Sequence, residues 1–232
     1  MSTRIPRVVD LTRTLTPGFP TAIADVPPVR RWQATTYESH GFSANGWSLV
    51  EHIGTHVDAP VHFVPGGRDV DAIPADELVL PARVVHLPSA QLVTVADLLV
   101  EERRRGPIPA RSAVLLCCGW GTREPDDRSY LGWDGTAYRA PGWSAEAVEW
   151  LVENRAIVAL GTDTSSIDAG DASAAHLALL GAGRYAIEGL VNLEQLVECS
   201  SFTLVVGVIP WESGTGGPCR ALALVAPAEE SP

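Results

Sequence analysis

The chain has 232 residues, a formal net charge of -11 and a hydrophobic fraction of 46%. This length fits one globular domain over residues 1–232, and the negative charge opposes binding to a polyanion, which excludes a nucleic-acid partner. No apolar run reaches the roughly 18 residues of a membrane span, and residues 1–13 lack the apolar stretch of a signal peptide. We therefore expect a soluble, cytoplasmic protein without a membrane partner.

The first half of the chain is predicted to be rich in strands. Runs of β-branched and aromatic residues at 7–11, 32–37 and 47–53 indicate strands, and Pro and Gly separate them. Residues 95–105 are predicted to form a helix capped by Thr94, and residues 113–118 a buried strand.

In the second half, helices and strands alternate. Ser144 is placed to cap a helix that ends near residue 155. The pattern then predicts a strand at 156–162, a helix at 173–180 ended by Gly181 or Gly183, a strand at 185–188, a helix from Leu193, and strands at 202–209 and 221–225. This order favours an α/β or α+β domain around one sheet system, without internal repeats.

The composition removes several kinds of chemistry. All 17 basic residues are arginine, so Schiff-base catalysis, pyridoxal phosphate attachment and a P-loop lysine are excluded. The sequence also has neither a GxSxG elbow nor a GxGxxG fingerprint. The four cysteines form no CxxC pair and are expected to be reduced, with Cys117 and Cys118 in the core. Histidines and carboxylates remain as the candidates for chemistry.

One segment, residues 52–63, concentrates such side chains. Four of them occupy even positions and would share one face of a strand: His52, His56, Asp58 and His62. The odd positions are mostly apolar, and Gly54 and Pro60 both oppose a helix. The segment is therefore predicted to be a strand that runs into a turn stiffened by Pro60.

A single histidine on such a strand is more often a structural residue than a ligand, and we interpret His40 and His86 in that way. Three histidines and an aspartate on one face are different. Burying them without a partner would cost several kcal/mol, whereas a divalent ion compensates the carboxylate and accepts neutral imidazole nitrogens. The cluster therefore predicts a metal site.

The segment HIGTHVDAPVH at 52–62 resembles the signature of the cyclase family of metal-dependent hydrolases, of the bacterial kynurenine formamidase and isatin hydrolase type. The resemblance extends from residues 9–11 through GTDTSSID at 161–168, His176, EGLVNL at 188–193 and GPCRA at 217–221. It implies a β-rich α/β fold with a swivelling β/β/α-like core, assembled as a homodimer or a larger homo-oligomer.

The resemblance also implies a ligand set, which consists of His52, His56, Asp58, His176 and Glu188. The first three would hold one divalent ion, His176 would belong to a second site, and Asp58 and Glu188 would bridge the two. His62 would be the general acid/base. Up to two ions per chain are expected, and the mixed ligands suit zinc and manganese about equally well. The implied reaction is attack of a metal-bound hydroxide on the carbonyl of a small-molecule substrate, which breaks an amide-type C–N bond of an aryl formamide or a cyclic amide.

The substrate is left open. Where kynurenine formamidase has Trp-Pro-Gly-Asp, residues 19–22 are Phe-Pro-Thr-Ala, so Phe19 is the expected substrate contact and the pocket mouth differs. Trp47, Phe63, Trp120 and Trp211 are further candidate pocket aromatics, although each has at least as strong a claim to a place in the core. Arg220 could bind a substrate carboxylate, but a pair with an internal acid is favoured.

Two other functions remain as alternatives. A biosynthetic cyclase or dehydratase acting on a polyketide-like intermediate would use the same metal as a Lewis acid, and the sequence does not decide between it and a hydrolase. A metal-binding protein without catalysis is the weakest hypothesis, because a complete ligand set together with His62 exceeds what storage requires.

Overall fold

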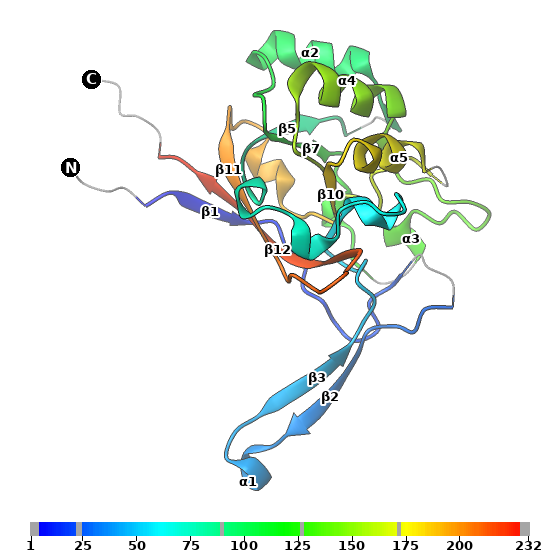
Figure 1. Ribbon diagram of the computed structural model, residues 1–232, viewed down its shortest axis with the longest axis vertical. Coiled ribbons are helices and arrows are strands. Elements are labelled where there is room, and N and C mark those ends of the chain that lie inside the picture. Colours follow the sequence, from blue (N-terminus) through cyan, green and yellow to red (C-terminus); the bar gives the residue numbers. More distant parts are fainter. Residues whose placement is uncertain (1–4, 22–24, 89–90, 126–127, 171–172, 228–232) are drawn as a thin grey trace.

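The fold, seen in a computed structural model, is built on one large sheet, and the structure describes residues 5–21, 25–88, 91–125, 128–170 and 173–227. The strand order is β1-β12-β11-β5-β7-β9-β10-β4, and β4 also pairs with β12. Seven strands therefore close into a barrel-like ring, with β1 added at the outer edge of β12 (Figure 1). The bounds of these strands are β1 Arg7–Asp10, β4 His56–Asp58, β5 Val79–His86, β7 Ala113–Cys117, β9 Ala159–Thr162, β10 Tyr185–Glu188, β11 Phe202–Val208 and β12 Gly216–Val225.

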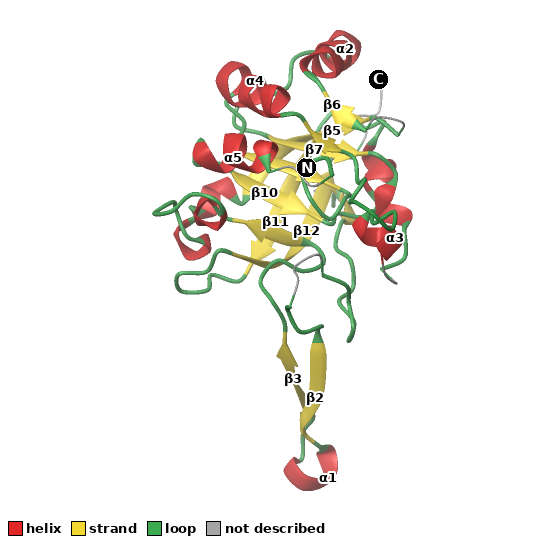
Figure 2. Cartoon of the chain, turned by 90° about the vertical axis from the view of Figure 1, so that its right-hand side faces the viewer, coloured by secondary structure: helices red, strands yellow, loops and turns green. Residues whose placement is uncertain are grey.

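Helices cover one side of this sheet. The central strands β5, β7, β9 and β10 are parallel, and such strands need crossover connections. The crossovers contain α2 (Val95–Arg105), α4 (Ala145–Arg155) and α5 (Ala174–Gly181), which lie together on one side of the sheet (Figure 2). Because β7, β9 and β10 pack against helices on one face and the barrel interior on the other, all their residues are buried. The predicted α/β class is confirmed.

Local capping explains where the long helices begin. At the start of α2 the Thr94 and Asp97 side chains form a capping box, and at the start of α4 the Ser144 hydroxyl accepts a hydrogen bond from the Ala147 N–H. Both helices were predicted with these caps. The helix expected from Leu193 is only the 3₁₀ turn Leu193–Leu196. Smaller elements are α3 Arg128–Leu131, β6 Leu92–Val93 and β8 Gly142–Trp143.

The segment that carries the histidine motif is less extended than predicted. Only His56–Asp58 forms a strand, because Gly54 before it adopts a left-handed backbone with φ 64° and Pro60 after it starts the 3₁₀ turn Pro60–His62. A Cβ at Gly54 would also lie 2.6 Å from the Leu15 side chain. The four polar residues therefore converge through two turns rather than along one strand face.

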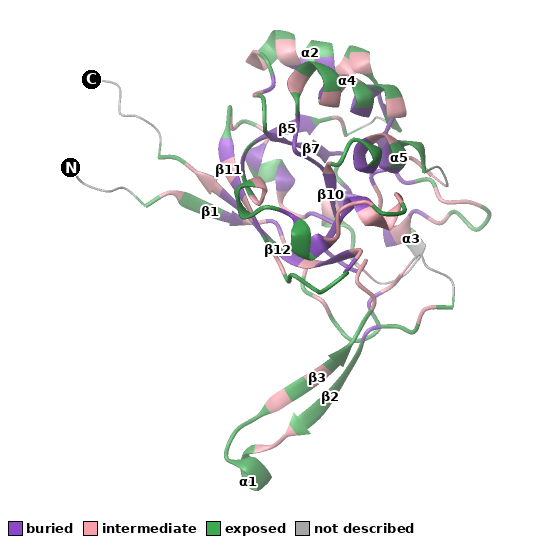
Figure 3. Cartoon of the chain, viewed as in Figure 1, coloured by how far each residue is buried: buried purple, intermediate pink, exposed green. Residues whose placement is uncertain are grey.

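Two strands form an arm that leaves the body of the molecule. β2 (Arg30–Thr35) pairs only with β3 (Ala44–Ser48), and the short helix α1 (Tyr37–His40) lies at the tip. The arm projects away from the barrel in Figures 1 and 2, and Figure 3 shows it without buried residues. The strands predicted at residues 32–37 and 47–53 are therefore observed a few residues earlier, at Arg30–Thr35 and Ala44–Ser48. Across the described ranges, no helix has the length and apolar character to cross a membrane.

Candidate metal centre

The five residues named as ligands come together where the ring of strands closes. His56 and Asp58 stand on β4, and Glu188 at the end of β10 is the direct cross-strand partner of His56. His176 is contributed by α5, and His52 by the loop before β4. The structure thus assembles residues that lie up to 136 positions apart in the sequence, from His52 to Glu188. Their roles as ligands remain a prediction that the geometry makes chemically reasonable.

Asp58 is at the centre of the cluster. Its Oδ1 lies 2.6 Å from His52 Nδ1 and 3.3 Å from His56 Nε2, and its Oδ2 lies 3.1 Å from His176 Nε2. The side chain is 1% exposed. One carboxylate therefore contacts both halves of the cluster through different oxygen atoms.

Glu188 spans the cluster in the same way. Its Oε2 lies 3.5 Å from His56 Nε2, and its Oε1 lies 3.1 Å from His176 Nε2 and also accepts the Ile167 N–H at 2.7 Å. Two groups of three candidate ligands result, and within each group the ligand atoms lie within 4.8 Å of one another. These groups are His52, His56 and Asp58, and Asp58, His176 and Glu188.

The outer nitrogen of each histidine is held by a second partner. His56 Nδ1 donates to the Gly54 carbonyl at 3.1 Å, and His176 Nδ1 bonds the buried Asp168 carboxylate. His52 Nε2 lies 2.8 Å from the Thr215 hydroxyl, which in turn donates to Glu51 Oε2 at 2.6 Å. Such outer partners orient imidazoles toward a metal.

These outer partners were not predicted from the sequence, although Asp168 lies in the 161–168 segment that resembles the cyclase family. Asp168 is eight positions from His176, and Thr215 is 163 positions from His52. The only local signal was the position of Asp168 inside a segment shared with the cyclase family.

Burial and charge together show that the donor set fits a cation. Burial disfavours the charged forms, yet Asp58 and then Glu188 raise the pKa of His56 to about 9. Burial likewise opposes the charge on His176, but its hydrogen bonds to Asp168, Asp58 and Glu188 raise its pKa well above 6.5. Without a metal, the carboxylates thus draw protons onto the histidines. A divalent ion bound by the three imidazoles and two carboxylates would supply the same compensating positive charge. This set of ligands suits zinc or manganese.

His62 occupies a different position from the other histidines. Its ring stacks on His52, with centroids 3.7 Å apart and planes 20° apart. Burial lowers the pKa of His62 to about 4; the other histidines add to this effect, and Asp58 opposes it. His62 is therefore neutral near pH 7.

A pocket of about 330 Å³ opens onto the cluster. Beyond the five candidate ligands and His62, it is lined by Pro20, Thr21, Ile53, Gly54, Phe63, Tyr130, Leu131, Ser165 and Ser166. Phe63 also stacks on the His176 ring with centroids 4.6 Å apart. The pocket is thus walled by apolar and hydroxyl-bearing side chains around a charged floor.

Phe19, the expected substrate contact, is not among the residues that line the pocket. Its side chain is 1% exposed and packs edge-on against Tyr130, with ring centroids 5.5 Å apart, behind the pocket wall. Pro20 and Thr21 line the pocket instead, because the Phe19 side chain packs into the small core cluster that also contains Ile53. The fourth residue of this motif, Ala22, lies outside the described residues.

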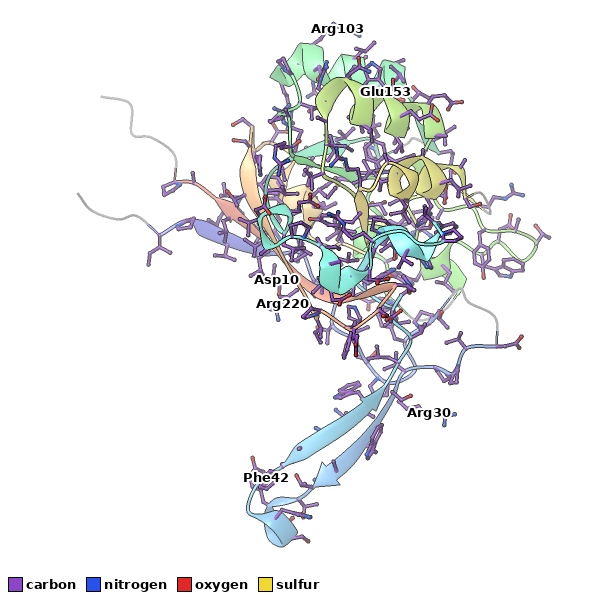
Figure 4. The ribbon with its side chains drawn as sticks, viewed as in Figure 1. Asp10, Arg30, Phe42, Arg103, Glu153 and Arg220 are labelled. Carbon is purple, nitrogen blue, oxygen red and sulfur yellow. The ribbon has the colours of Figure 1, made fainter. Side chains whose placement is uncertain are left out.

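Of the other aromatic candidates, Trp120 is buried in the core, and Trp47 and Trp211 line a second cleft. Arg220 pairs with Asp10, from Nη2 to Oδ2 at 2.5 Å and from Nε to Oδ1 at 3.0 Å; the two residues are labelled next to each other in Figure 4. Arg220 therefore pairs with an acid, as favoured, although this acid lies at the surface rather than in the interior.

Comparison with known proteins gives a consistent result. Residues 9–169 match the Cyclase family model, described as "Putative cyclase". Isatin hydrolase of Roseibium aggregatum is 32% identical, covering 94% of this chain and 91% of that protein. Kynurenine formamidase of Paracidovorax citrulli is 27% identical, with 94% and 96% covered. The solved structure of isatin hydrolase A from Ralstonia solanacearum superposes with a TM-score of 0.87 at 34% identity over 95% of this chain and 92% of that chain. All three are hydrolases by name, which confirms the prediction of a hydrolytic enzyme.

The hydroxyl that holds His52 leads to a first prediction. Thr215→Val removes the partner of His52 Nε2 without changing side-chain size much, so the affinity of the apo-protein for Zn²⁺ or Mn²⁺ should fall by about 10- to 100-fold. Competition with a chromogenic chelator measures it. Thr215→Ser keeps the hydroxyl and should restore the affinity. Equal metal affinities for the Val and Ser variants would show that the hydroxyl does not position His52.

Proposed function

We propose that this chain, which belongs to the cyclase family, is a divalent-metal-dependent hydrolase of an amide-type C–N bond. The observation that carries the proposal is the cluster in which Asp58 is shared by two groups of candidate ligands beside a neutral His62. The resemblance to isatin hydrolase over nearly the whole chain supports it.

The ligands divide naturally between two positions. His52 and His56 face Asp58 Oδ1, and His176 faces Asp58 Oδ2, while Glu188 reaches from one side to the other. We propose up to two ions per chain, zinc or manganese, with both carboxylates as bridges. When bound, divalent ions supply positive charge that lowers the pKa of water and polarises a carbonyl oxygen.

Within this scheme His62 moves the proton. Its imidazole is neutral near pH 7, lines the pocket and is held by stacking on His52. It accepts the proton of the attacking water and delivers it to the leaving nitrogen, a step that an amide requires because an amide anion is a poor leaving group.

The pocket wall favours an uncharged substrate. Among the described residues that line the pocket, only the candidate ligands carry a formal charge. The rest of the wall consists of apolar groups, serine and threonine hydroxyls, Tyr130 and the neutral His62. The amino-acid zwitterion of formylkynurenine would find no arginine there to bind its carboxylate, and burying an unpaired charge is costly. A flat neutral lactam of the isatin type fits better, and we place the aryl formamides second.

A substrate panel tests this assignment. Purified enzyme loaded with Mn²⁺ or Zn²⁺ should open isatin and related neutral lactams with a kcat/KM at least about tenfold above that for formylkynurenine, because each poorly paired buried charge costs well over 1 kcal/mol. Product formation followed by absorbance and mass spectrometry measures it. Faster turnover of formylkynurenine would reverse the preference. Dehydration or ring closure of a substrate without C–N cleavage would support the cyclase alternative instead.

The proton-transfer role of His62 leads to a second test. His62→Ala should retain the metal content of the wild type but lose roughly 10²- to 10⁴-fold in kcat, the usual effect of removing a positioned acid/base. Elemental analysis and turnover are measured on the same preparation. If His62→Ala instead loses as much metal as His56→Ala, His62 is a ligand and the proposed role is wrong.

The bridging role of Glu188 determines the metal stoichiometry. Glu188→Gln preserves size but removes one negative charge, so repulsion between two cations grows and the content should fall from two ions towards one per chain, with His52, His56 and Asp58 retaining the first. Isothermal titration of apo-protein measures the stoichiometry. Glu153→Gln, an exposed change on α4, is the matched control. Unchanged metal content and activity in Glu188→Gln would remove Glu188 from the centre.

A further inference from the structure

A tyrosine hydroxyl lies at the inner end of the pocket and has no place in the ligand set. Tyr130 of α3 lines the pocket, and its hydroxyl lies 3.1 Å from the point that a Cβ on Gly189 would occupy. Gly189 directly follows the candidate ligand Glu188, whose charge acts on the phenol. The Tyr130 hydroxyl therefore stands at the boundary between the pocket and the candidate metal centre.

The Tyr130 ring is held in one position by its neighbours. It packs edge-on against Phe19, and the Trp120 indole N–H donates to the Tyr130 carbonyl at 2.8 Å. The guanidinium carbon of Arg13 lies 5.0 Å from the ring centroid, and the residue is only 2% exposed. A donor fixed in this way needs no reorganisation when charge develops beside it.

Arg13 brings a positive charge to this ring. Its Nη1 donates to the Arg123 carbonyl at 2.8 Å, and its Nη2 donates to the Gly121 carbonyl at 2.9 Å. Both acceptors are neutral, so these bonds hold the guanidinium in place without neutralising its charge. The backbone N–H of Arg13 also donates to Thr55 Oγ1 at 2.8 Å, which ties this residue to the histidine motif.

The phenol of Tyr130 is the most acidic hydroxyl among the described residues of the pocket wall. Burial raises the pKa of Tyr130 to about 12, and the charge of Arg13 opposes this rise, so the hydroxyl keeps its proton near pH 7. The other hydroxyls, of Thr21, Ser165 and Ser166, are aliphatic alcohols and weaker acids. A hydrogen bond from the phenol strengthens as its acceptor becomes negatively charged.

We propose that Tyr130 is a catalytic residue whose hydroxyl donates a hydrogen bond to the carbonyl oxygen of the substrate. Arg13 is the positioning residue behind it. This inference rests on the proposed hydrolase function and adds a donor for the charge that the reaction creates on the carbonyl oxygen.

The electron and proton movements define the role of each group. As the water oxygen bonds to the carbonyl carbon, its proton passes to His62 and the π electron pair moves onto the carbonyl oxygen. Tyr130 stabilises that oxygen and keeps its own proton. The pair then returns to the C–O bond as the C–N bond breaks, and the nitrogen leaves with the bonding pair and the proton from His62.

Tyr130→Phe tests the hydroxyl, because it keeps the ring that packs against Phe19. The variant should hold the wild-type metal content and lose roughly 10²- to 10³-fold in kcat, the usual effect of removing one oxyanion donor, with KM within about threefold. Elemental analysis and steady-state kinetics with isatin, the expected best substrate of the panel, measure both.

Tyr185→Phe is the matched control. Tyr185 is also buried, but its hydroxyl donates to the Glu77 carbonyl at 2.7 Å and it is not among the residues that line the pocket. Losing this hydrogen bond should lower the thermal stability and leave kcat within about twofold of the wild type. A kcat loss in Tyr185→Phe as large as that in Tyr130→Phe would overturn the proposal.

A double-mutant cycle tests whether Arg13 acts through Tyr130. Arg13→Gln should lower kcat by roughly tenfold in the wild type and by less than about twofold in Tyr130→Phe, because the hydroxyl that Arg13 supports is then already absent. A merely structural role for Arg13 would give the same loss in both backgrounds. Equal losses would therefore overturn the positioning role.

Three further results would overturn the catalytic role of Tyr130. They are a wild-type kcat in Tyr130→Phe, a change confined to KM, and a loss of metal that accounts for the lost activity. Each leaves hydrolysis by the wild type intact, so each is distinct from failure of the proposed function. In that last case the wild type cleaves no amide-type substrate, and this inference falls with it.

Discussion

The structure depends on two carboxylates, Asp58 and Glu188, that are buried beside each other on neighbouring strands. Placing one unpaired charge in a protein interior costs several kcal/mol, and two like charges at this separation cost more. Histidines surround both groups, and their raised pKa values show how strongly the site attracts positive charge. That positive charge lowers the free-energy cost of burying both carboxylates beside β4. The electrostatics of the fold therefore favour a cation at this position, as the proposed metal centre requires.

The position of the cluster follows from how β4 closes the ring. This three-residue strand pairs with β10 on one edge and β12 on the other, so His56 and Asp58 are fixed from both sides. Close approach requires glycine on each side. A Cβ at Gly189 would collide with the Gly54 carbonyl, and one at Gly216 would meet the Val57 carbonyl and lie 2.6 Å from His52 Cε1. The backbone around the site is therefore as constrained as its ligands.

Features that depend on local chemistry were predictable from the sequence. The helices at 95–105 and 145–155 begin at side-chain caps, and the dense motif at 52–62 indicated a metal site by itself. His176 and Glu188 were implied only by the family resemblance, because each stands in an apolar local context. The sequence pattern did not predict β5, because Pro81 and Arg83 interrupt its apolar residues, or the first half of β12. Both strands pair with partners that are distant in sequence. Phe19 was misplaced because no local pattern shows which side of a turn faces a pocket.

The arm shows another limit of prediction from the sequence. Its aromatic residues predicted strands, as they would in a buried hairpin, because a pattern of apolar side chains does not say which molecule covers them. Only three residues separate Ser48, the last residue of β3, from His52, and one of them, Glu51, both lines the cleft and bonds Thr215. Whatever orders the arm therefore also restricts the loop that presents His52. The arm and the geometry of the candidate metal centre are linked through this short connection.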